Sequence, residues 1–129
     1  MGLLTKDQLT TKRPVRIERV DVPELGEDAH VFVKGMTTSE RARFERQFVT
    51  SSGQPNERNS IQYRERLLVA CVCDADGNAI LDLGDVTALA EQSADIVDRI
   101  ATACQDVVGI KKRDAEKLAG NSDTTTPDD

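Results

Sequence analysis

The spacing of apolar residues changes its period once along this chain, close to Gly35. Before it, Val31 and Val33 alternate with their neighbours at a period of two, which is typical of a strand. After it, apolar residues recur three and four positions apart, most regularly over residues 93–108, which predicts amphipathic helices. We therefore expect an α+β fold: an N-terminal antiparallel β-hairpin followed by a small, mostly helical bundle.

The expected hairpin consists of two strands and one turn. Val15–Val22 is the first strand, and its alternation loses parity between Ile17 and Val20, which predicts a β-bulge. Pro23–Asp28 contains both proline and glycine, the residues that favour turns. Ala29–Lys34 then returns as the second strand.

A single helical turn is expected ahead of the hairpin. Thr5 and Gln8 have the spacing of a capping box, in which each side chain accepts a hydrogen bond from the other residue's backbone N–H. We expect Leu3, Leu4 and Leu9 to pack inward from this turn.

Several segments after Gly35 have helical features. The expected helices are one that starts at the capping box 37–40, then residues 61–73, 85–91, 93–108 and 114–119. Residues 61–73 are ambiguous, because Leu67–Cys73 fits a buried strand equally well; strong helix formers in its first half favour one buried helix. Residues 50–60 contain no apolar side chain and are expected to be a mobile connector.

The chain has 129 residues, the length of one domain. We expect that domain to span residues 1–120, followed by a disordered acidic tail over 121–129, which has no apolar side chain to bury. No signal peptide is recognisable, and no apolar stretch approaches the ~18 residues of a membrane span. We therefore expect a cytoplasmic protein that does not bind membranes.

The charges are distributed unevenly. Residues 1–66 carry 12 Lys or Arg against 10 Asp or Glu, whereas residues 67–129 carry 5 against 13. Proteins that bind nucleic acid usually gather basic side chains on one surface. Because basic and acidic residues interleave in the first half and acidic residues dominate the second, we expect no nucleic-acid partner.

One loop has some features of a calcium site. Asp74–Asn78 supplies several oxygen ligands, but an EF-hand loop requires glycine at position six and a bidentate Glu at position twelve. Here glycine comes at position four, and position twelve is Asp85. The sequence is better explained by a tight turn.

The cysteines and the single histidine are the potential zinc ligands. Cys71 and Cys73 are separated by one residue, whereas paired zinc ligands are usually two to four residues apart. Cys104 and His30 have no ligand motif around them. We expect three buried, reduced cysteines and no metal or other cofactor.

No catalytic arrangement is recognisable either. The sequence has no glycine-rich phosphate loop, and no motif places a base beside a nucleophile. We therefore expect no enzymatic activity. An apolar groove that accepts a partner helix is the function that these residues favour.

Four segments of the chain resemble the tail assembly chaperones of long-tailed bacteriophages. They are MGLLTKDQL at residues 1–9, VDVPELG at 20–26, MTTSERARFERQF at 36–48 and LLVACVCDADGNAILDLGDVTALAEQS at 67–93. The resemblance extends over about residues 3–122.

This resemblance implies a function in tail assembly. Such a chaperone binds the tape measure protein, keeps it soluble, helps recruit tail tube subunits, and is absent from the mature virion. It acts in the cytoplasm of the infected bacterial host, as a homo-oligomer or as many copies on one partner chain. A structural virion component such as a head–tail connector, or a small regulatory binding protein, remains the alternative.

The resemblance supplies no binding motif, so contact residues are inferred from side-chain chemistry. Phe44 and Phe48 lie four positions apart on an expected helix, and aromatic side chains are frequent anchors at interfaces. We predict that both bind the partner. The alternative is that both belong to the core, which has few other aromatic residues.

Overall fold

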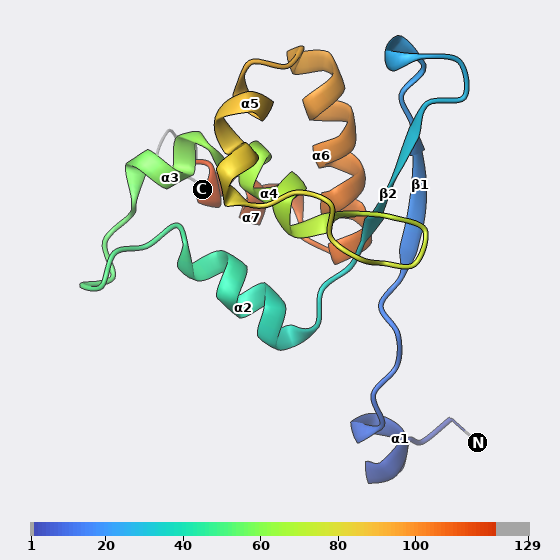
Figure 1. The fold of residues 1–129 in the computed structure, drawn as a ribbon. Coiled ribbons are helices and arrows are strands. Elements are labelled where there is room, and N and C mark those ends of the chain that lie inside the picture. Colours follow the sequence, from blue (N-terminus) through green and yellow to red (C-terminus); the bar gives the residue numbers. More distant parts are fainter. Residues whose placement is uncertain (1, 121–129) are drawn as a thin grey trace.

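The structure, a computed structural model, describes residues 2–120 and has an α+β fold, as expected. A small antiparallel sheet with strand order β1-β2-β3 packs on one side against helices, of which α4 and α6 form the central pair (Figure 1). The elements in chain order are α1 (Lys6–Thr10), β1 (Ile17–Asp21), η1 (Pro23–Leu25), β2 (His30–Lys34), α2 (Thr38–Arg46), α3 (Glu57–Ile61), α4 (Tyr63–Cys71), β3 (Val72–Cys73), η2 (Leu83–Asp85), α5 (Val86–Ala90), α6 (Ala94–Val108) and α7 (Lys112–Leu118).

The hairpin is confirmed, but the predicted bulge is wrong. β1 and β2 pair residue by residue from Ile17 opposite Lys34 to Asp21 opposite His30, so no residue is left over. Val20 is buried against the helices, whereas Ile17 lies on the other face, where its side chain reaches the turn at Gly77. The change of parity in the sequence reflects apolar residues on both faces of one regular strand.

Residues 61–73, whose sequence fits either a helix or a strand, contain both. Residues up to Cys71 are helical, in two helices that meet at Gln62, and the last two residues form the short strand β3. Our expectation of one helix through Cys73 is therefore wrong at both ends. Val72 and Cys73 lie opposite residues of β2, and this pairing stabilises an extended backbone in a segment whose local preference is nearly neutral.

Local signals at helix ends agree with the structure. Thr5 and Thr37 both form complete capping boxes, at the starts of α1 and α2. α6 ends at Gly109, whose φ of 85° lies in the left-handed region that glycine adopts without strain. The apolar stripe of α6 faces α4, and the centre of the core contains Leu67, Cys71 and Cys104, all fully buried.

The hairpin turn is tied to α6 by an ion pair. Both terminal nitrogens of Arg99 donate to the Glu24 carboxylate, one of them over 2.6 Å between Nη1 and Oε1. These hydrogen bonds lower the pKa of Glu24 from 4.5 to about 2. The contact joins residues far apart in sequence and links the tip of the hairpin to α6.

The packing of the first residues differs from our prediction. Leu3, Leu4 and Leu9 are 93%, 59% and 72% exposed, so our prediction that they pack inward is wrong. Figure 1 shows α1 standing away from the body, joined to β1 by an extended segment. The capping box specifies the helix locally, but it does not determine whether the leucines within and before these five residues pack on the core.

The predicted acidic tail at 121–129 lies outside the described residues. Among the helices of residues 2–120, none combines the length and the apolar character that crossing a membrane requires.

Candidate binding surface

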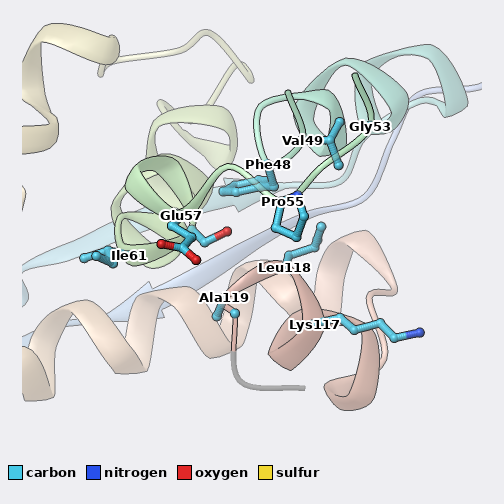
Figure 2. A pocket seen from close by; sticks show the side chains of 11 residues that line it. Phe48, Val49, Gly53, Pro55, Glu57, Ile61, Lys117, Leu118 and Ala119 are labelled. Carbon is cyan, nitrogen blue, oxygen red and sulfur yellow. The ribbon is translucent and has the colours of Figure 1, made fainter. Parts of the chain in front are cut away.

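An open pocket lies between the segment that follows α2 and the end of α7. Its volume is about 550 Å³, within the range of roughly 300–1000 Å³ that is usual for ligand pockets. The apolar side chains that line it are Phe48, Val49, Pro55, Ile61, Leu118 and Ala119. Figure 2 shows Phe48, Pro55 and Leu118 close together in the middle of the pocket, while the Lys117 side chain points away.

One wall of the pocket is a loop closed by hydrogen bonds. The backbone N–H of Thr50 donates to the carbonyl oxygen of Gln54 over 2.7 Å, and that of Asn56 donates to the carbonyl of Phe48 over 2.9 Å. Gly53 has a φ of 84°, which suits glycine at this tight turn. These contacts hold Val49 at the rim.

The next residues begin a helix rather than continuing a connector. Asn56 caps α3 by accepting from the backbone N–H of Asn59 over 3.1 Å, and the Asn59 side chain donates to the carbonyl of Gln47 over 2.7 Å. Our prediction of an unstructured connector is therefore wrong for residues 57–60. Polar caps, and not apolar contacts, specify this short helix.

Two rim residues expose apolar surface to solvent. Ile61 is 78% exposed and Val49 is 44% exposed, although both are large aliphatic side chains. Single exposed aliphatic residues are common, but here they border a concave apolar surface. This combination is typical of a binding site for apolar side chains.

The structure places the two predicted contact residues in the core. Phe44 and Phe48 are each 3% exposed, and with Tyr63 they form an aromatic cluster. The ring centroids lie 5.1 Å apart for Phe44 and Phe48, and 5.6 Å apart for Phe48 and Tyr63. This is the core alternative described above, although Phe48 also lines the pocket. That either residue contacts a partner stays a prediction.

The third aromatic residue is held by a polar contact. The Tyr63 hydroxyl accepts a hydrogen bond from Gln105 over 3.4 Å, and burial raises the pKa of Tyr63 above its usual value of 10. The hydroxyl is therefore neutral near pH 7.

Sequence reasoning missed the other lining residues. Ile61 alone gave a local signal, since it is an apolar residue directly after a long polar stretch. Leu118 and Ala119 gave none, because only the tertiary fold brings α7 beside the loop at residues 49–55.

The predicted tight turn at Asp74–Asn78 is present. One Asp74 oxygen accepts hydrogen bonds from the backbone N–H groups of Asp76 and Asn78, each over 2.9 Å. These hydrogen bonds lower the pKa of Asp74, and the one from Asn78 contributes most. The carboxylate therefore stabilises the turn itself.

Of the potential zinc ligands, the structure brings Cys71 and Cys104 together, but His30 does not join them. All three cysteines are buried free thiols, as predicted, but His30 is exposed and its Nδ1 lies 2.8 Å from the carbonyl oxygen of Asp28. A hydrogen bond with Cys71, together with burial, raises the pKa of Cys104, so this thiol is protonated and unreactive. Within residues 2–120 no group of three or more His, Cys, Asp or Glu side chains is arranged to hold a metal ion.

Comparison with known proteins finds a similar fold in a solved structure. No family model matches the sequence, and no curated protein matches it. A solved structure, that of the bacteriophage HK97 tail assembly chaperone, has a similar fold with a TM-score of 0.52 and 18% sequence identity. The similarity covers 71% of this chain and 84% of that chain.

Proposed function

We propose that this protein is a phage tail assembly chaperone. It binds the tape measure protein, keeps it soluble, helps recruit tail tube subunits, and leaves before the virion is complete. The observation that carries the proposal is the fold, which is shared with most of the HK97 tail assembly chaperone. The resemblance of the four sequence segments to this family also supports it.

The apolar pocket is our candidate for the contact with the tape measure protein. Its open shape and exposed rim suit apolar side chains on one face of a helix, a common mode of peptide recognition. The protein acts by binding alone, without a catalytic step. Phe48 contributes as the buried base of the pocket, with Phe44 behind it.

One such pocket provides a modest contact, so the proposal includes multiple copies. A long tape measure protein carries many apolar helical segments, and many copies on one chain cover it through weak individual contacts. Weak contacts also permit release of each copy as tube subunits assemble. This activity takes place in the cytoplasm of the infected host.

Co-expression with the tape measure protein of the same phage tests the proposal. The measurement is the fraction of tape measure protein that stays in the soluble lysate and copurifies with this chain. We expect the wild-type chain to raise this fraction strongly and a pocket variant, Val49→Asp with Ile61→Asp, to lose most of that effect.

Leu25→Ser is the matched control, because Leu25 is 59% exposed on the hairpin turn, outside the pocket. It should behave as the wild type. No rescue of tape measure solubility by the wild-type chain would refute the chaperone function. Rescue by the pocket variant at the wild-type level would refute the pocket as its site.

A further inference from the structure

The N-terminal arm, defined here as residues 2–14, has no packing partner in the described chain. Every one of its residues is exposed, including three leucines, and α1 has no substantial contact with another element. Isolated helices shorter than about 12–15 residues are marginal in water. The five residues of α1 therefore need a surface to pack against.

The arm joins the body at a fixed point. Val15 is half-buried beside Gly35, and the backbone N–H of Gly35 donates to the carbonyl oxygen of Arg16 over 2.8 Å. From this point the arm extends away from the sheet (Figure 1). In Figure 1, α1 lies at the lower right, away from the loop between α2 and α3 at the left.

The charges of arm and body are complementary. The arm, residues 2–14, contains three basic side chains and one acidic one, whereas residues 15–129 contain 14 basic and 22 acidic ones. A basic arm is therefore attracted to the acidic body of another copy. At the pocket, Glu57 lies among the lining residues, while the ammonium group of Lys117 points away.

We propose that the apolar pocket of one copy binds the leucines of the N-terminal arm of a second copy. Leu3, Leu4 and Leu9 are exposed apolar side chains, and no side chain of residues 2–120 fills the apolar pocket. Because arm and pocket are two different surfaces that lie apart in the molecule, the contact is head-to-tail, and repeating it produces a ring or an open chain of copies.

This inference goes beyond the proposed function, because it concerns contacts between copies before any partner binds. Where the proposed function also holds, arm and tape measure protein occupy the same pocket in turn. The apolar surfaces of the unloaded protein are then covered until a tape measure segment displaces the arm.

Sedimentation velocity of two complementary full-length variants tests the contact. The arm variant carries Leu3→Ser, Leu4→Ser and Leu9→Ser and keeps its pocket; the pocket variant carries Val49→Asp and Ile61→Asp and keeps its arm. Melting curves first verify that each remains folded. The wild type and the Leu25→Ser control should form species that grow with concentration, and each variant alone should be monomeric.

An equal mixture of the two variants is the decisive sample. It contains one intact arm and one intact pocket per pair, so it should form a heterodimer and nothing larger. A wild type that stays monomeric at every concentration, arm variants that associate as the wild type does, or a mixture that stays monomeric would each overturn the proposal. None of these results involves the tape measure protein, so the proposed function is tested separately.

Discussion

Replacing Phe48 by Ala separates its two possible roles, core residue and partner contact. The side chain is 3% exposed and packs against Phe44 and Tyr63. Removing a buried phenylalanine ring typically costs about 3–5 kcal/mol, which combines lost burial with the cavity that remains. Because the total stability of a domain is about 5–15 kcal/mol, this change is a large part of it.

The melting temperature reports this loss directly. For a chain of this length, 1 kcal/mol corresponds to roughly 3–5 °C, so Phe48→Ala should lower the melting temperature by about 9–25 °C. Urea unfolding followed by circular dichroism measures the free energy itself. Phe48→Leu is the control: it keeps most of the apolar volume and should cost less than about 1.5 kcal/mol.

The reasoning fails if Phe48→Ala loses less than about 1 kcal/mol. That result would mean that the ring is not packed as the structure places it. If such a stable variant also failed to capture the tape measure protein, Phe48 would be an exposed contact residue, as the sequence first suggested.

Three further changes test other parts of the fold. Cys104→Ala should cost about 1–2 kcal/mol, because Cys104 is fully buried beside Cys71, and thiol reagents should label the wild-type cysteines only on unfolding; rapid labelling of the native protein would contradict this. Gly35→Ala should destabilise the fold by about 1–3 kcal/mol, since the added Cβ would lie 3.0 Å from the carbonyl oxygen of Val107. Gly2→Ala is the control and should leave the stability unchanged, because no atom beyond its chain neighbours lies within 4 Å of the added Cβ. Equal stabilities of the two variants would show that the close approach at Gly35 is absent. Glu24→Gln should lower the melting temperature at pH 7. The difference from the wild type should shrink as the pH falls from 4.5 through about 2, because the Glu24 carboxylate stabilises the fold only while it is charged and its pKa is lowered to about 2. A difference that does not depend on pH would exclude the Arg99 ion pair as its cause.

Local signals account for the parts of the fold that the sequence predicts. The capping boxes at Thr5 and Thr37, the stripe of α6 and the stop at Gly109 each depend on residues within a few positions of one another. β3 depends instead on pairing with β2, so Val72 and Cys73 cannot be assigned from their own preferences.

The candidate binding surface could be predicted only in part for the same reason. The aromatic type of Phe48 and its spacing from Phe44 made it a candidate contact residue. Its burial depends on Tyr63 and α7, and the sequence alone does not show that these lie beside it. The exposure of Leu9 is the opposite case. An apolar residue on a predicted helix suggests a core position, and only the fold shows that the arm leaves the body.

The most direct test of the chaperone function is the amount of this protein at each stage of tail assembly. Quantitative mass spectrometry compares its copy number per tape measure protein in affinity-purified assembly intermediates with that in purified mature virions. We predict several copies per tape measure protein before the tube forms and none in the mature particle. A fixed number of copies in mature virions would identify a structural component instead, and absence from the tape measure intermediates would contradict the chaperone function.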